Sequence, residues 1–196
     1  MTDRRARIER TTRETKIEAS IDLDGVGNGA INTGIGFLDH MLSAVALHGR
    51  VDLELACRGD LDVDDHHTVE DVAIVVGQLV DQALGDRTGI VRFAHAYAPL
   101  DEALARVVVD LSGRPSATIA LGLEREMLGS VACENLTHWF VSFATAARCA
   151  LHVDVLRGEN DHHRAEAAFK ALALALRGAI AMDPRPAGVP STKGVL

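Results

Sequence analysis

Two short stretches of the chain, DDHHTVED at 64–71 and NDHHRAEA at 160–167, place a pair of adjacent histidines one helical turn before a glutamate. On a helix, residues three or four positions apart lie on one face, so Glu70 and Glu166 each share a face with the histidines before them. Neighbouring histidines on a helix point about 100° apart, so both cannot easily bind one ion. We therefore expect each pair to serve two different metal ions.

Two further histidines stand at matching positions, since His40 precedes His66 by 26 residues and His138 precedes His162 by 24. The repeated motifs then supply six of the nine histidines and two glutamates as candidate metal ligands: His40, His66, His67, Glu70, His138, His162, His163 and Glu166. Eight ligands are enough for two sites of three imidazoles and one carboxylate. Such donors suit Mn²⁺, Fe²⁺ or Zn²⁺, and the absence of thiolates argues against a structural zinc site.

The same order of expected elements surrounds these ligands in both halves of the chain. That order is a strand with a turn (15–25 and 105–113), a helix carrying one histidine (37–49 and 135–150), a short strand (51–57 and 151–156) and a long helix opened by the histidine pair (66–84 and 162–182). The repetition indicates an internal duplication. We expect an α+β fold, a two-layer α/β sandwich with its helices packed together on one face of a sheet.

The two halves are expected to share one core. No Pro-, Gly- or Ser-rich linker separates them, and GDRTG at 85–89 is typical of a turn. We therefore predict a first half-repeat at 1–88 and a second at 89–183, fused into one globular domain. The remaining residues, 184–196, complete a segment that holds three of the five prolines, and we expect an irregular tail.

Composition narrows the classes of function. The formal charge of −8 disfavours nucleic acid as a partner, although a few focused cations could still bind a small phosphorylated ligand. The N-terminus is too polar for a secretory signal, and no apolar run approaches the roughly 18–20 residues of a membrane span. Three cysteines without a CxxC spacing indicate reduced thiols. These features predict a cytoplasmic enzyme or binding protein.

Several segments, in order, resemble the imidazoleglycerol-phosphate dehydratase family: RTTRETKI (10–17), GFLDHML (36–42), DDHHTVED (64–71), NDHHRAEAAFKALALALR (160–177) and PSTKG (190–194). The resemblance covers essentially the whole chain. It implies a hydro-lyase that dehydrates imidazoleglycerol phosphate to imidazole-acetol phosphate in L-histidine biosynthesis. It also implies a duplicated fold of the ribosomal protein S5 domain 2-like type, with a sheet face and a four-helix face. Trimers would assemble into a hollow 24-mer with active sites between subunits.

The resemblance further implies two Mn²⁺ ions per active site. Carried over by motif, the first ion would take His40, His67, Glu70 and His163. The second would take His66, His138, His162 and Glu166. Each ion would then draw ligands from both halves, and these need not come from one subunit. The ions would act as Lewis acids and as a template for the substrate.

Residues outside the histidine motifs also match the family. Glu14, in RTTRETKI, is the candidate for moving a proton or positioning the substrate. The candidate contacts to the substrate and its phosphate are His48, Arg92, Arg114, Lys170, Ser191 and Lys193. Arginine binds phosphate through two parallel hydrogen bonds, and a tail that orders over substrate would explain the serine and lysine near the C-terminus.

Two other functions fit the histidine clusters. A dinuclear metallohydrolase acting on a phosphate ester would favour bridging aspartates and ions roughly 3.5–4 Å apart, whereas this chain offers mostly histidines. A non-catalytic metal store would need the histidines but not the phosphate-binding set of Arg92, Arg114 and Lys193. A thermal shift that depends on phosphate would separate the metal store from the enzymes.

Overall fold

Alternating apolar and polar residues build two separate four-stranded sheets in the computed structural model, which describes residues 3–185 and 188–194. The first sheet has the order β1-β2-β4-β3 and consists of β1 (Arg5–Thr11), β2 (Thr15–Asp22), β3 (Gly29–Asn32) and β4 (Asp52–Gly59). The second has the order β5-β6-β10-β7 and consists of β5 (Phe93–Leu100), β6 (Ala103–Asp110), β7 (Ser116–Ala120) and β10 (Ala150–Arg157). The matching strand orders show that the duplication extends to sheet topology.

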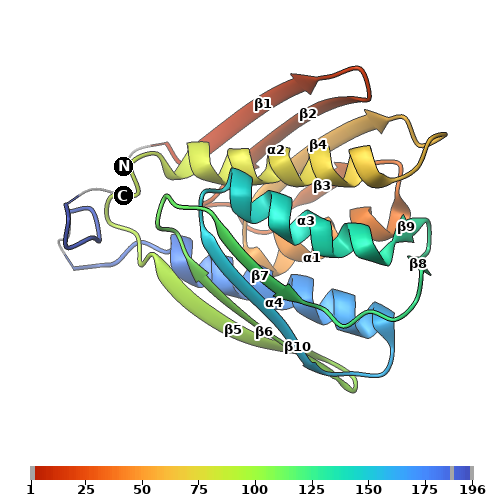
Figure 1. Cartoon of the computed structure of the whole chain (residues 1–196). Helices are drawn as coiled ribbons and strands as arrows, with labels where there is room; N and C mark the ends of the chain where they lie inside the picture. Colours follow the sequence, from red (N-terminus) through yellow and green to blue (C-terminus); the bar gives the residue numbers. More distant parts are fainter. Residues whose placement is uncertain (1–2, 186–187, 195–196) are drawn as a thin grey trace.

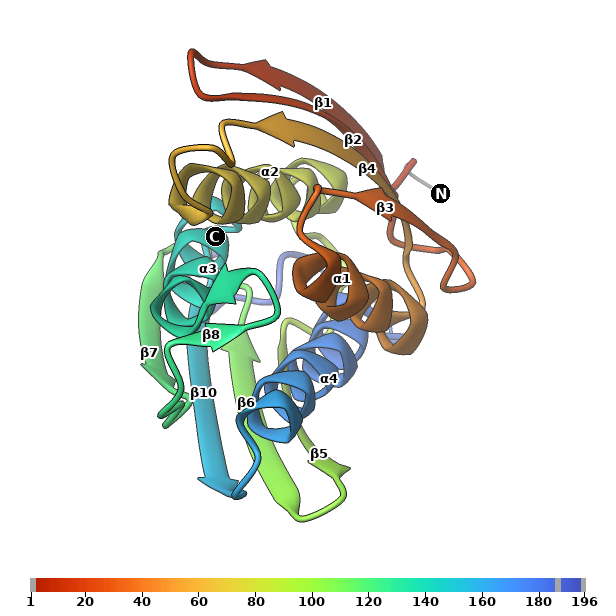
Figure 2. The same ribbon diagram turned by 90° about the vertical axis from the view of Figure 1, so that its right-hand side faces the viewer.

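The four helices in the described part of the chain lie between the two sheets (Figures 1 and 2). They are α1 (Gly36–Gly49), α2 (His66–Leu84), α3 (Cys133–Ala146) and α4 (Asp161–Ile180). Helices α1 and α2 pack on the first sheet, and α3 and α4 pack on the second. Across the middle of the molecule α2 packs on α3, and α1 packs on α4. A short hairpin of β8 (Met127–Leu128) and β9 (Val131–Ala132) leads into α3.

The predicted α+β class and its internal duplication are confirmed, and each half is a two-layer sandwich of sheet and helices. The arrangement of the layers differs from the expectation of one sheet face and one four-helix face, because each half keeps its own sheet. The reason is visible in α4, where 13 of 20 residues are buried. A helix buried around so much of its surface needs a sheet on one side and other helices on the other.

The core consists mainly of Ala, Val, Leu and Ile side chains, with one exception. Trp139, Phe140, Phe143 and Phe169 form an aromatic cluster between α3 and α4, with the Phe140 and Phe169 ring centroids 4.6 Å apart. This cluster fixes how the two helices of the second half pack together. Helix α3 ends earlier than predicted because Arg148, with φ of 51°, turns the chain into β10.

Helices α2, α3 and α4 begin at the same end of the molecule, opposite the chain termini (Figure 1). The histidine pairs stand at the first turns of α2 and α4 and are therefore carried to that end. None of the helices among residues 3–185 and 188–194 is both long enough and apolar enough to span a membrane.

Candidate metal-binding active site

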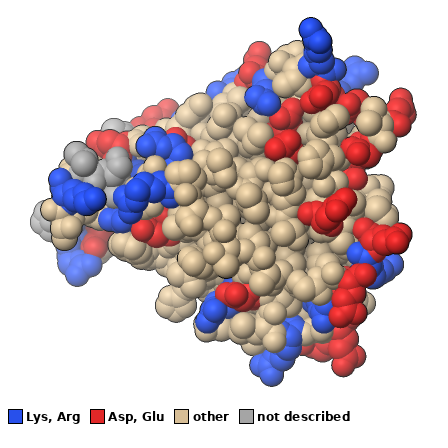
Figure 3. Space-filling model, in the orientation of Figure 1, with Lys and Arg blue, Asp and Glu red and all other residues tan. Residues whose placement is uncertain are grey.

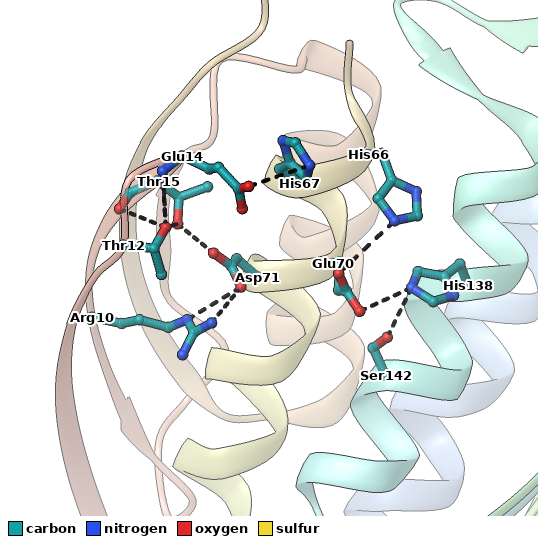
Figure 4. Close-up of polar contacts among 10 residues, drawn as sticks. All are labelled: Arg10, Thr12, Glu14, Thr15, His66, His67, Glu70, Asp71, His138 and Ser142. Carbon is teal, nitrogen blue, oxygen red and sulfur yellow. Dashed lines mark hydrogen bonds and ion pairs between the residues drawn. The ribbon is translucent and has the colours of Figure 1, made fainter. Parts of the chain in front are cut away.

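The first cluster of candidate ligands lies between α2 and α3 and consists of His66, Glu70 and His138. Their ligand atoms all lie within 4.8 Å of one another. Nε2 of His138 is 3.1 Å from one carboxylate oxygen of Glu70, and Nε2 of His66 is 3.9 Å from the other (Figure 4). The side chains converge because the first turn of α2 packs against α3. Three such donors around a common point are a fitting arrangement for a divalent ion.

Two polar neighbours orient this first cluster. The Oδ1 atom of Asn135 lies 2.9 Å from Nδ1 of His66, so a proton on Nδ1 donates to the amide and Nε2 is left as a lone-pair donor. Ser142 Oγ lies 3.4 Å from Nε2 of His138. Both neighbours come from α3, so the same helix supplies the ligand His138 and the residue, Asn135, that orients the ring of His66.

The second cluster lies between α1 and α4 and consists of His40, His162 and Glu166. One oxygen of Glu166 is 3.2 Å from Nε2 of His40 and 3.1 Å from Nε2 of His162. The other oxygen pairs with Nζ of Lys170 at 2.6 Å. Burial alone would raise the pKa of Glu166, but the hydrogen bonds from Lys170 and His40 outweigh it and lower the pKa to about 2. The carboxylate is therefore anionic at neutral pH, as a metal ligand must be.

The remaining histidine of each pair points away from its cluster and binds a carboxylate. Nδ1 of His67 is 3.0 Å from Asp60, and Nδ1 of His163 is 2.7 Å from Glu102. These hydrogen bonds are the largest cause of a raised pKa at each histidine. A carboxylate on Nδ1 fixes the ring and directs Nε2 outward, as in metal-binding histidines. Nε2 of His67 also lies 3.6 Å from the carboxylate of Glu14.

Within one chain the candidate ligands group differently from the split that the family resemblance implied, and that split stays a prediction. Glu166 meets His40 rather than His138, and Glu70 meets His138 rather than His40. The physical reason is helix pairing: α1 packs on α4 and α2 packs on α3, so each lone histidine faces the glutamate of its own partner helix. The inference that adjacent histidines serve different ions is compatible with this grouping, since each pair sends one ring into a cluster and one away.

The carboxylates before the histidine pairs act on the main chain and not as helix caps. Oδ2 of Asp65 accepts from the backbone N–H of Ala132 at 2.8 Å. Asp161 accepts from two successive backbone N–H groups, those of residues 124 and 125, at 2.8 and 2.7 Å. Each aspartate thereby fixes a loop beside the candidate site. The first turns are instead closed by Asp64 and Asn160, whose side chains accept from the backbone N–H of the first histidine in each pair.

The predicted phosphate ligands divide into two groups in space. Lys170 lies one turn after Glu166. His48 lies close enough to Lys170 for the positive charge of the lysine, after burial, to lower the pKa of His48. Arg92 lies at the far end of α4, where its backbone N–H donates to Ala179 O. Ala179 follows Glu166 by 13 residues, which is about 20 Å along the helix axis.

The C-terminal tail meets Arg92 at that far end. Its guanidinium pairs with Asp110, with Nε to Oδ1 at 2.7 Å, and donates from Nη1 to Pro190 O at 2.6 Å. Ser191 follows directly, and its Oγ accepts from the backbone N–H of Lys193. The tail prediction falls partly outside the described residues, at 186–187 and 195–196. Arg114 is exposed after β6, and its guanidinium donates to Ser112 O at 3.4 Å. One chain therefore does not bring this second group to the histidine clusters.

Charge is distributed unevenly over the face shown in Figure 3. Asp and Glu line the end at which α2 and α4 begin, and several Lys and Arg gather near the termini (Figures 1 and 3). Acidic groups around the clusters favour the approach of divalent cations. The middle of the same face, over α3, carries little charge (Figure 3).

Sequence reasoning did not single out Asp60, Glu102 and Asn135, although all three contact candidate ligands. A signal for Glu102 was present, because it immediately precedes β6 as Glu14 immediately precedes β2. Asn135 stands 69 positions from the histidine that it contacts, so only the packing of α2 on α3 identifies it.

Comparison with known proteins gives one consistent result. A family model described as imidazoleglycerol-phosphate dehydratase matches residues 33–176. A curated protein of that name from Pseudomonas fluorescens (strain Pf0-1) is 51% identical, with all of both chains covered. Another, from Phytophthora nicotianae, is 58% identical over 98% of this chain but 42% of its own length.

Solved structures agree with the sequence comparison. The imidazoleglycerol-phosphate dehydratase of Staphylococcus aureus subsp. aureus N315 superposes with a TM-score of 0.83 at 38% identity, covering 91% of this chain and 99% of that one. The structure of IGPD from Pyrococcus furiosus in complex with (S)-C348 gives a TM-score of 0.82 at 37% identity, covering 96% and 100%.

Proposed function

Since the chain belongs to the imidazoleglycerol-phosphate dehydratase family of hydro-lyases, we propose that it catalyses the manganese-dependent conversion of imidazoleglycerol phosphate to imidazole-acetol phosphate. We place this reaction in L-histidine biosynthesis and in the cytoplasm. The observation that supports the proposal most directly is the pair of three-residue clusters, each built from one HHxxE helix and the histidine of the helix packed against it.

The donor sets fit Mn²⁺. Each cluster offers two imidazole nitrogens and one carboxylate oxygen, and no thiolate, within 4.8 Å of one another. His66, Glu70 and His138 would hold one ion, and His40, His162 and Glu166 the other. When bound, such ions supply Lewis acidity toward the imidazole ring of the substrate, which makes the ring a better acceptor of electrons.

His67 and His163 would complete the two clusters of a neighbouring subunit. Each ring is held through Nδ1 by a carboxylate, so Nε2 is presented away from its own cluster. The separation of about 20 Å between Glu166 and the region of Arg92 also argues for a site shared between copies of the chain. We propose trimers assembling into a 24-mer, with active sites between subunits.

The reaction removes a hydroxyl from the carbon attached to the ring and a proton from the neighbouring carbon, and the resulting enol becomes a ketone. Glu14 is our candidate for the group that accepts this proton. Its carboxylate is half-exposed and lies 3.6 Å from Nε2 of His67, so it stands beside a proposed ligand without being enclosed. A carboxylate in that position can move a proton while the ring is held by the neighbouring ligands.

The cations of the chain would hold the phosphate of the substrate. Arg92 is preorganised by Asp110 and by the carbonyl of Pro190, which places the tail residues Ser191 and Lys193 in the same region. Arg114 and Lys170 add positive charge, and His48 lies near Lys170. Together they would bind and orient the phosphate, and the tail would exclude water from the bound substrate.

The proposed function is tested by metal removal and re-addition. Protein stripped with a chelator and reloaded with Mn²⁺ is expected to convert imidazoleglycerol phosphate to the ketone, while stripped protein is inactive. His67→Ala and His163→Ala should each lower turnover at least about 100-fold, because each removes a proposed ligand. His152→Ala, at an exposed position of β10, is the matched control and should keep its activity.

If the protein binds Mn²⁺ but forms no ketone, the dehydratase proposal is rejected. A metallohydrolase or a metal store would then be tested on other phosphate esters and by the phosphate-dependent thermal shift described above.

A further inference from the structure

A polar cluster lies buried between the first hairpin and α2, on the side of that helix away from His138 (Figure 4). Asp71, directly after the proposed ligand Glu70, accepts a hydrogen bond from Thr15 Oγ1 at 2.5 Å. The guanidinium of Arg10 donates to the other oxygen of Asp71 at 2.7 and 3.2 Å. Asp71 is 6% exposed and Thr15 is 3% exposed, so water competes little for their hydrogen bond, whereas the Arg10 side chain remains 34% exposed.

This cluster ties the turn that carries Glu14 to the helix that carries His67. Thr15 follows Glu14 directly and forms the first position of β2. Within the turn, Thr12 Oγ1 accepts from the backbone N–H groups of Glu14 and Thr15 at 3.1 and 2.9 Å. The position of Glu14 relative to His67 is therefore set through Thr12, Thr15 and Asp71.

The duplication provides an internal comparison for this cluster. The residues of the second half at the same positions are all buried alanines: Ala98, Ala103 and Ala167. Ala103 is the first residue of β6, as Thr15 is of β2. Ala167 follows its histidine pair by four residues, as Asp71 does, and the strand pairing aligns Ala98 with Arg10. The fold therefore packs this junction without polar groups in one half.

The two halves also treat the equivalent glutamates differently. Glu102 occupies the place of Glu14, but it serves as an anchor itself: its carboxylate accepts from the backbone N–H groups of Glu159 and Asn160 and contacts His163. The Glu14 carboxylate lies 3.6 Å from Nε2 of His67, and 50% of the Glu14 side chain is exposed. In the first half, Thr15 and Asp71 do the anchoring, which leaves the carboxylate of Glu14 available.

We propose that Asp71, with Thr15 and Arg10, is a positioning device that holds Glu14 in register with His67 for the dehydration. The inference rests on the proposed function, because it assigns Glu14 the proton-moving role. Burying a carboxylate and a hydroxyl seldom stabilises a fold more than apolar packing does. A buried polar set found only beside the available glutamate is consistent with selection for geometry.

The test is a double-mutant cycle between Thr15→Val and Glu14→Gln in the Mn²⁺-loaded protein. Thr15→Val keeps the shape and removes the hydrogen bond to Asp71. We expect it to lower kcat about 10- to 100-fold with KM within about twofold, because a displacement of about 1 Å has effects of this size. Bound Mn²⁺ should be unchanged. In the Glu14→Gln background, Thr15→Val should cause no further loss. With Glu14 intact, Thr15→Ser keeps the hydroxyl and should therefore keep kcat close to that of the unmutated protein.

Two other variants separate positioning from general stability. Asp81 lies farther along α2 and forms a partly buried ion pair with Arg87. Asp81→Asn weakens this ion pair and should lower the melting temperature without lowering kcat. If Thr15→Val does not fold, Thr15→Ala replaces it, since the second half carries alanine there.

The possible failures are distinguishable. Absence of ketone formation by the unmutated, Mn²⁺-loaded protein would reject the proposed function itself. If that protein is active, additive losses in the cycle would overturn the positioning role. An unchanged kcat in either Thr15→Val or Glu14→Gln would overturn it as well, while leaving the dehydratase function intact.

Discussion

At the scale of single residues, the candidate site depends on side chains that orient other side chains. Asn135 illustrates this role. Its amide oxygen lies within hydrogen-bonding distance of Nδ1 of His66 and so determines which ring nitrogen faces the cluster. Neutral imidazole binds a metal through one nitrogen only, so an unheld ring loses affinity by adopting other tautomers and rotamers.

Replacing Asn135 should therefore weaken the binding of one metal ion and leave the binding of the other unchanged. We expect Asn135→Ala to reduce the Mn²⁺ affinity of the His66 cluster about 10- to 100-fold. Titration of stripped protein, followed by the electron paramagnetic resonance of free Mn²⁺, should show one weakened class of site and one unchanged class. Asn32→Ala, at an exposed position of β3, is the control. Equal affinities in Asn135→Ala and the unmutated protein would mean that the ring is oriented by other contacts.

The buried thiols predict a loss of stability in alkali. Burial raises the pKa of Cys57 to about 11 and that of Cys149 to about 12, from an unfolded value of 9.0. Above pH 9 the unfolded chain loses thiol protons that the folded chain keeps, so stability is complete below pH 9 and falls as pH rises toward 11. Each thiol should contribute a slope of up to about 1.4 kcal/mol per pH unit.

This contribution can be isolated by a difference measurement. The melting temperature of Cys149→Ala should fall less steeply between pH 8 and pH 10.5 than that of the unmutated chain, because lysine and tyrosine titrate equally in both. Parallel curves for the two proteins would contradict burial of that thiol.

At the scale of elements, helix pairing decides which ligands meet. Residue types and spacing identified all eight candidate ligands, because period and repetition are properties of the sequence. They did not predict that, within one chain, Glu70 lies beside His138 and Glu166 beside His40. Helical periodicity tells which face of α2 is apolar, but it does not tell that this face packs on α3.

The sequence reasoning missed strand β1 for a related reason. β1 reads RARIERT, and no residue of it is fully buried, so its alternation is hidden by charged side chains. It forms an edge of the first sheet, where one side of the strand meets solvent. The turn between β1 and β2 nevertheless carries Glu14, so an element with a weak signal supplies a candidate catalytic group.

A single glycine permits the close approach of α2 and α3. A Cβ added at Gly77 would lie 2.6 Å from Phe143 O and 2.7 Å from the Cβ of Ala146. Gly77→Ala should therefore push the helices apart and cost about 1–3 kcal/mol of stability. Because Glu70 and His138 sit on these two helices, Mn²⁺ affinity of their cluster should fall together with the melting temperature.

The control for this substitution is Gly36→Ala, since nothing lies within 4 Å of the added carbon there. Calorimetry and Mn²⁺ titration of both variants make the comparison. A destabilised Gly77→Ala protein with an unchanged affinity at the His66 cluster would show that metal geometry does not depend on the spacing of α2 and α3.

At the scale of the whole molecule, one chain gathers three candidate ligands per cluster and leaves His67 and His163 outside both clusters. His67 and His163 are each fixed through Nδ1, and both belong to the end of the molecule where α2 and α4 begin. Arg92 is likewise separated from the clusters of its own chain, since its distance from them exceeds the length of a small phosphorylated substrate. A site that spans two copies accounts for both observations with one arrangement.

Mixing two inactive variants tests this arrangement directly. His40→Ala removes a candidate ligand of the second cluster. His67→Ala removes the ring that we propose completes that cluster from a neighbouring subunit, in keeping with the shared ion of His40 and His67 that the family resemblance implied. In a randomly mixed assembly, about a quarter of the sites would combine an intact cluster from one subunit with an intact His67 from another. Dissociating the two variants together and reassembling them with Mn²⁺ should thus restore about a quarter of the turnover per subunit. Reassembly of either variant alone is the control and stays inactive. Mixed particles, shown by mass to contain both chains, that remain inactive would mean that His40 and His67 act within one subunit.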